Sequence, residues 1–237
     1  MFNFKDKKIL IIAPHPDDEV FGCGGLISRA KREGAKVYVL YITVGTTKDF
    51  SKKGVSTEKE RVKEIATVAK FLKLDGYRLA FPGNDYHLQL DAVPQKKLIH
   101  EIEQGKDISL ESLKPTIVIT CSNHDYNQDH RAVSQSVMTA TRPAPAEYKS
   151  LQKLVLTHEY AYTAWTDRES QPVPTFTVEL SKKDLATKLK ALSLYKSQLK
   201  HPHGPLSIHA VKTLAYLRGI QAGTNIAEAF FIKRFLT

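Results

Sequence analysis

Four short apolar runs, separated by segments of helical character, constrain the fold of this chain most. Runs of this length and composition are typical of strands buried on both faces of a parallel sheet. Regular alternation of such strands with helices predicts an α/β fold, with a mostly parallel sheet and helices on both faces. The four runs cover residues 8–13, 36–43, 77–81 and 116–120.

The segments between these runs carry helix signals. One begins near Gly22–Gly25 and ends at Gly34, the residue type that most often follows a helix. Thr57 and Glu60 have the spacing of a capping box at the start of another helix. Two further helices are predicted over residues 92–103 and 130–140.

The alternation changes after residue 140. Two strands and then a helix are predicted there, over residues 154–160, 175–180 and 182–198. Because no Gly/Ser linker and no internal repeat interrupts the chain, we expect one domain over residues 1–237. It would consist of a core over residues 1–140 and a C-terminal α+β extension over residues 141–237.

The net charge of +10, from 35 Lys and Arg against 25 Asp and Glu, invites a nucleic-acid interpretation. The basic residues are scattered, however, and no run of five or more occurs. We therefore expect a solvated surface and no nucleic-acid partner. The rival hypothesis of a nucleic-acid binder predicts salt-sensitive retention on a polyanion.

Other features of the composition concern the compartment. No apolar run approaches the roughly 20 residues of a membrane span, and the first residues lack the long apolar stretch of a secretory signal. The two cysteines, Cys23 and Cys121, exclude a disulfide framework. The sequence predicts a soluble, cytoplasmic protein without a membrane partner, and it leaves a homo-oligomer open.

Chemistry concentrates directly after the first apolar run, in Pro14-His15-Pro16-Asp17-Asp18-Glu19. Ligands of such sheets bind where strands end, and like charges gathered there require a positive partner. A divalent metal meets this need: imidazole and carboxylate suit zinc, whereas magnesium is the weaker alternative. The remaining alternative is a solvated acidic loop with a helix-capping Asp. Glu19 is expected to support His15 or to act as a helix N-terminal acid.

A second polar segment, residues 120–131, follows the fourth run. It contains four groups that could bind metal or move protons: His124, Asp125, Asp129 and His130. In a parallel sheet the first and fourth strands can be neighbours, so that the two segments can face each other. Together they predict a first-row metal site that draws ligands from both.

These motifs resemble a known family. His15-Pro16-Asp17-Asp18-Glu19, Gly24-Gly25 and Asp129-His130-Arg131-Ala132-Val133 are similar to the PIG-L/LmbE-like zinc-dependent N-acetylglucosaminyl deacetylases. Two C-terminal stretches, residues 190–198 and 218–230, extend the resemblance over nearly the whole chain. The resemblance implies a Rossmann-like fold and a hydrolase that removes the N-acetyl group from an N-acetylglucosamine-type amino sugar or its conjugate.

By match to the family motif, His15, Asp18 and His130 would hold Zn²⁺ or another divalent first-row metal. Asp17 would be the general base acting on the attacking water. Three protein ligands leave a position open, as a catalytic site requires. Zinc lowers the pKa of a bound water toward about 7, and a carboxylate base typically adds roughly 10²–10⁴-fold.

The sequence departs from the family at one catalytic position. Asp129 would support a neighbouring His that the family usually has three residues before the ligand His, but this chain has Asn127 there. An Asn side chain can donate a hydrogen bond to an oxyanion, worth roughly 3–4 kcal/mol in other enzymes. It cannot act as a general acid. Either His124 delivers the proton, or protonated Asp17 returns it, or this branch of the family works differently.

One further residue and two rival functions stay open. In similar proteins an Arg in the region of Arg61 contacts substrate, and a solvated helix charge is an equal alternative. One rival is an amidase of the same family that acts on another acyl group or on an amino-sugar thiol conjugate. The other is a non-catalytic, metal-retaining Rossmann-like binding module, which only Asn127 favours.

Overall fold

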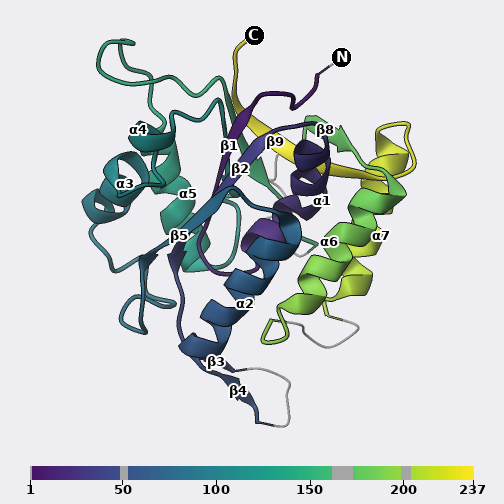
Figure 1. Cartoon of the computed structure of the whole chain (residues 1–237), viewed down its shortest axis with the longest axis horizontal. Coiled ribbons are helices and arrows are strands. Elements are labelled where there is room, and N and C mark those ends of the chain that lie inside the picture. The colour runs from purple at the N-terminus through teal and green to yellow at the C-terminus, as the bar shows by residue number, and fades with distance from the viewer. Residues whose placement is uncertain (1, 49–52, 162–172, 199–203) are drawn as a thin grey trace.

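A seven-stranded sheet runs through the molecule (Figure 1). Its strands lie in the order β5-β2-β1-β6-β7-β9-β8. The computed structural model describes residues 2–48, 53–161, 173–198 and 204–237. The strands of the sheet are β1 (Lys8–Ala13), β2 (Lys36–Thr43), β5 (Gly76–Phe81), β6 (Ile117–Cys121), β7 (Leu154–His158), β8 (Phe176–Glu179) and β9 (Ala227–Phe235). A separate antiparallel ribbon joins β3 (Thr47–Lys48) to β4 (Val55–Ser56).

The five strands from β5 to β7 are parallel, so the predicted mostly parallel sheet is confirmed. The apolar β1 lies in its centre, where Ile9 pairs with Val37 on one side and with Ile117 on the other. A central strand is covered on both faces, which is why this run is apolar without alternation. β9 lies between β7 and β8 and is antiparallel to both of them.

Helices cover both faces of the sheet, as Figure 1 shows. Successive residues of β1 point into different cores: Ile9 and Ile11 into one, Leu10 and Ile12 into the other. Each such fully buried side chain contributes about 1.5–3 kcal/mol. The first core is closed by α1 (Asp18–Arg32), α2 (Glu58–Leu72), α6 (Lys182–Leu194) and α7 (Ile208–Gln221); the second by α3 (Gln95–Gln104), α4 (Leu110–Leu113) and α5 (Gln128–Ala140).

Local signals set most helix boundaries. The capping box at Thr57 is confirmed: Thr57 Oγ1 accepts a hydrogen bond from Glu60 N, and Glu60 Oε2 accepts one from Thr57 N at 2.7 Å. Gly34 follows α1 with a φ of 92°, as a C′ glycine should. The predicted start of α1 near Gly22 is wrong, because acids are favoured in a first helical turn and the helix already begins at Asp18.

A buried ion pair between Glu228 and Lys188 contacts the backbone of α1. Glu228 of β9 accepts hydrogen bonds from Gly25 N and Leu26 N, at 2.8 and 2.6 Å. Lys188 of α6 donates to Glu228 at 2.6 Å and to the carbonyl of Phe21 at 2.7 Å. A Cβ at position 25 would lie 2.3 Å from Leu180 Cδ1 and 3.0 Å from the Glu228 carboxylate, so this close approach requires glycine. The side chains of Glu228 and Lys188 thus form hydrogen bonds with backbone groups in the interior of α1.

The C-terminal part joins the same sheet as the N-terminal part. The predicted helix over residues 182–198 is α6, which ends earlier, at Leu194. Neither α7 nor β9 was predicted from the sequence. The boundary at residue 140 and the single domain over 1–237 stay predictions, although described strands on both sides of residue 140 pair with each other.

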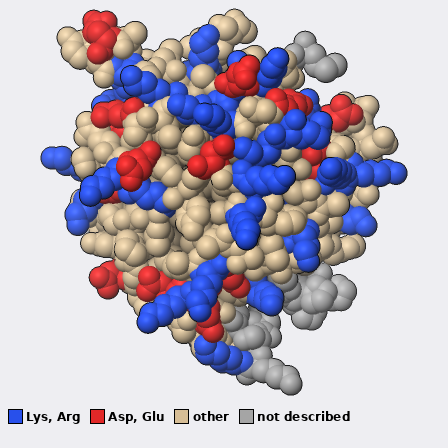
Figure 2. All heavy atoms as spheres, viewed as in Figure 1, with Lys and Arg blue, Asp and Glu red and all other residues tan. Residues whose placement is uncertain are grey.

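The surface carries mixed charge. On the face shown in Figure 2, Lys and Arg side chains are interspersed with Asp and Glu. Within the ranges described, no helix is long and apolar enough to cross a bilayer.

Candidate metal centre

The two polar segments lie at the carboxyl ends of β1 and β6, which pair directly. The first leads into α1, so Asp18 is the first residue of that helix. The second leads into α5, whose third residue is His130. Both helices therefore point their N-termini at the same edge of the sheet, where backbone N–H groups stabilise negative charge.

Three side chains meet there in a geometry suited to a metal. His15, Asp18 and His130 are buried, and each offers one donor atom within 4.8 Å of the other two. Asp18 Oδ2 lies 3.5 Å from His15 Nδ1 and 3.4 Å from His130 Nε2. Two imidazoles and one carboxylate are a donor set that first-row divalent metals accept.

The outer atom of each of these side chains is held by another residue. His15 Nε2 lies 2.8 Å from Asp129 Oδ2, and His130 Nδ1 lies 2.8 Å from Asp125 Oδ2. Tyr160 donates a hydrogen bond to Asp18 Oδ1 at 2.7 Å. Carboxylates on the outer nitrogens fix ring orientation in metal sites, so the inner donor atoms are left to converge.

The charges of this group depend strongly on one another. Burial opposes ionisation of Asp18, but the nearby His130 and His15 hold the pKa of its carboxyl well below the usual range. Burial likewise opposes the charged form of His15, but the Asp129 and Asp18 carboxylates outweigh it and raise the His15 pKa to about 9. Buried carboxylates here demand positive charge, which protons or a metal cation can supply.

Asp17 lies beside the three donors with an unusual backbone. It is the N-cap of α1 at φ 114°, a region that costs about 1–3 kcal/mol and clusters at functional sites. The chain enters α1 directly after Asp17. Burial and the neighbouring Asp18 raise the pKa of the Asp17 carboxyl well above its ordinary value.

Glu19 supports this conformation. Its Oε2 accepts a hydrogen bond from Asp17 N at 3.0 Å, and its Oε1 accepts from the hydroxyls of Tyr41 and Tyr195 at 3.0 and 2.6 Å. Glu19 is a first-turn acid, as one alternative predicted, but its partners are these groups and not His15. Burial, against these hydrogen bonds, raises its pKa to about 7.

A cavity of about 120 Å³ opens onto the three donors. Arg61 lines it, and its Nη1 donates to the carbonyl of Gly45 at 2.9 Å. With 1% of its surface exposed, Arg61 is not the solvated helix charge that one alternative proposed. A contact between Arg61 and substrate stays a prediction.

The remaining predicted residues occupy different places. Asn127 lines the cavity and caps α5, with Oδ1 accepting from Asp129 N at 2.9 Å. Because position 127 is Asn, Asp129 has no His there to support. Its carboxylate instead bonds to His15 and to the backbone N–H groups of Leu88 and Leu90. His124 is not among the described residues that line the cavity. Its backbone N–H donates a hydrogen bond to Ser122 Oγ. A role of His124 in proton delivery stays a prediction.

Three contributors were missed from the sequence. Asp125 was seen in the polar segment without a role, and Tyr160 was expected at the end of a strand. His87, between β5 and α3, also lines the cavity. Only the topology brings Tyr160 and His87 to this edge, and nothing in the sequence around them marks it.

Comparison with known proteins agrees with this geometry. The family model described as PIG-L, GlcNAc-PI de-N-acetylase, matches residues 10–141, which include both polar segments. The chain belongs to the PIG-L family. The recognition made from the motifs is thereby confirmed.

Individual PIG-L relatives extend the match. YaiS of Escherichia coli K12, an uncharacterized deacetylase, is 30% identical over 143 residues, covering 60% of this chain and 71% of YaiS. A probable N-acetyl-α-D-glucosaminyl L-malate deacetylase of Bacillus cereus is 23% identical over 223 residues, 90% of this chain and 95% of the relative. The crystal structure of the conserved protein TT1542 from Thermus thermophilus has a TM-score of 0.71 at 29% identity, covering 98% of this chain and 96% of that protein.

Proposed function

We propose that this PIG-L family member is a metal-dependent hydrolase that removes the N-acetyl group from an N-acetylglucosamine-type amino sugar or its conjugate. The observation that carries the proposal is the convergence of His15, Asp18 and His130 at a cavity that Asp17 also lines. Such a set binds a metal and places a carboxylate base beside it. The reaction would split a linear, non-peptide amide C–N bond into free amine and acetate.

Zinc is the proposed metal, with other divalent first-row ions as alternatives, because the donor set suits both. His15, Asp18 and His130 would hold it, while Asp129, Asp125 and Tyr160 keep these three oriented. When bound, zinc would bring the pKa of a water near neutrality and polarise the acyl oxygen.

The protein's own groups would handle substrate and protons. Asp17 takes a proton from the attacking water at a carboxylate oxygen, a task that its raised pKa suits. As the C–N bond breaks, the leaving nitrogen receives a proton from Asp17 or from His124. Asn127 donates a hydrogen bond toward the acyl group, and Arg61 contacts the substrate from the cavity wall.

The substrate class follows from the chemistry named for the family and from the Bacillus cereus relative. We propose a small amino-sugar conjugate as the partner, encountered in the cytoplasm, with neither nucleic acid nor membrane involved. The scattered charges of the sequence support this. The metal-retaining binding module remains the second candidate, because Asn127 replaces the His that the family usually has.

The proposal is tested by acetate release from free N-acetylglucosamine and from its conjugates with malate, inositol and an aryl alcohol. Each assay compares metal-stripped protein with protein reloaded with zinc. Zinc-dependent acetate from any member supports the deacetylase, and the ranking identifies the conjugate. Absence of acetate from all of them, with one metal bound per chain, would overturn the proposal and favour another acyl substrate or the binding module.

A further inference from the structure

His87 is a side chain of the cavity that the steps above do not use. It lies in the segment between β5 and α3, and it lines the same cavity as Asp17 and Asn127. Its ring meets the ring of His15 edge to face, with centroids 5.4 Å apart and an interplanar angle of 84°. His87 is therefore next to the reacting centre.

Both ring nitrogens of His87 are buried, and no described residue forms a hydrogen bond with either of them. Buried polar atoms are nearly always satisfied, so a buried imidazole with two unpaired nitrogens needs an explanation. The other two imidazoles among the described residues that line this cavity, His15 and His130, have carboxylate partners on their outer nitrogens. A ligand in the cavity would supply the partner that His87 lacks.

The position of the His87 ring is fixed by the surrounding chain. On one side is Gly45, where a Cβ would lie 2.4 Å from Cβ and Cγ of His87. On the other side Leu88 has a φ of 58°, and its N–H donates to Asp129 Oδ2 at 3.0 Å. Gln128 Nε2 donates to the Leu88 carbonyl at 3.0 Å. The start of α5, which carries His130, thus also positions His87.

The imidazole of His87 carries at least one N–H in every charge state. Burial, reinforced by the positive charges of His15 and Arg61, lowers the pKa of His87 to about 4. A neutral imidazole has one N–H to donate.

We propose that His87 is a catalytic residue whose ring donates an N–H hydrogen bond to the acyl oxygen of the bound amide. This inference rests on the proposed deacetylase function. The donor serves the oxygen as it gains negative charge during attack on the acyl carbon, and no bond to His87 forms or breaks. Loss of one such preorganised donor typically lowers kcat by about 10²–10³-fold.

The test compares three variants in the zinc-loaded protein. His87→Phe keeps a ring and removes both nitrogens, whereas His87→Gln keeps an N–H donor that cannot titrate. His100→Phe is the matched control, because His100 lies exposed on α3 and bonds only to Gln104 among the described residues. Zinc content and thermal unfolding are measured for each variant, so that a folding or metal defect is recognised.

Two readouts separate the outcomes. We expect His87→Phe to lower kcat by about 10²–10³-fold with KM changed less than about threefold, and His87→Gln to recover part of that loss. By calorimetry, a phosphonamidate analogue of the substrate, with tetrahedral phosphorus replacing the acyl carbon, should bind His87→Phe more weakly by about the same factor. The control should match the wild-type protein in both.

Four results would overturn the inference. A His87→Phe kcat within about threefold of wild type removes His87 from catalysis. Unchanged analogue affinity removes the hydrogen bond to the oxyanion. Loss of zinc from His87→Phe assigns the residue to metal retention instead. A wild-type protein that releases no acetate overturns the proposed function itself, whereas an active wild type with an equally active His87→Phe overturns the role of His87 alone.

Discussion

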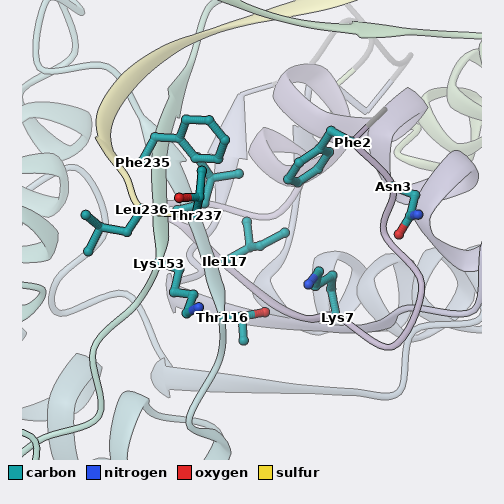
Figure 3. Close-up of a pocket in the computed structure, with 10 residues that line it drawn as sticks. Phe2, Asn3, Lys7, Thr116, Ile117, Lys153, Phe235, Leu236 and Thr237 are labelled. Carbon is teal, nitrogen blue, oxygen red and sulfur yellow. The ribbon is translucent and has the colours of Figure 1, made fainter.

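A cavity opens at each of the two edges of the sheet, and the larger of these two lies at the edge that lacks the candidate metal donors. At the carboxyl edge, a cavity of about 120 Å³ is lined by imidazoles, carboxylates and Arg61. At the amino ends of β1, β6 and β7, a cavity of about 300 Å³ is lined by Phe2, Phe235 and Ile117 with two lysines, Lys7 and Lys153 (Figure 3). The Phe2 and Phe235 rings lie 6.4 Å apart.

The difference follows from the direction of the parallel strands. Helices that follow parallel strands begin at the carboxyl edge, so the N-termini of α1 and α5 gather there and favour anions. At the amino edge those helices end, and none of the described residues lining its cavity is a carboxylate or a histidine. Between these two cavities, volume alone would favour the amino edge, whereas the donor chemistry favours the carboxyl edge.

The largest effect is expected for Asp17→Asn. Removing the base should lower kcat by about 10²–10⁴-fold, while the metal stays bound because Asp17 is not among the three donors. Initial rates and metal analysis measure both. Asp6→Asn is the matched control at the amino edge, since Asp6 also has a positive φ, 57°, that Asn tolerates. Equal activity of the two variants would remove the contrast between the edges.

The next effect concerns stability. Glu228→Gln leaves the buried Lys188 without its charge partner and should lower the free energy of unfolding by about 3–5 kcal/mol, measured with urea. Lys31→Met breaks a half-buried pair with Asp75 near the end of α1 and should cost about 0–1 kcal/mol. Equal losses would show that the Lys188–Glu228 pair does not specially support the helix that carries Asp18.

A smaller effect sharpens the account of the donors. Asp125→Ala frees the outer nitrogen of His130 and should weaken metal affinity by about 10–100-fold, measured by competition with a chelator. Glu111→Ala, at an exposed carboxylate on α4, should leave the affinity unchanged. An Asp125→Ala protein with wild-type affinity would show that the His130 ring needs no such support.

The smallest effect is expected at the amino edge itself. Lys153→Met removes a charge from the larger cavity and should change kcat/KM by less than about twofold, as is usual for substitutions away from a site. The assay is acetate release under the conditions used for Asp17→Asn. A large loss of activity in Lys153→Met would show that the cavity at the amino edge contributes to function.

Sequence patterns predicted the parallel core because apolar runs are local signals, whereas the three donors were assigned by match to the family motif. The apolar run over 8–13 and the adjacent His15 and Asp18 are read directly from neighbouring residues. Boundaries failed where local signals conflict: α3 begins at Gln95, later than predicted, because Pro94 disfavours helix in the residue before it. Tyr160 and His87 could not be found, because strand order alone carries them to the donors.

The position of β9 has a consequence for the time course of synthesis. β9 follows every other strand of the sheet in the chain, yet β8 pairs only with β9 among the described strands. While the ribosome is still translating the segment before residue 227, β8 has no neighbour to join. Glu228 is synthesised 203 residues after Gly25, from whose N–H it accepts a hydrogen bond. The nascent chain therefore carries its cluster of acids near the N-terminus long before the strand that steadies α1 exists.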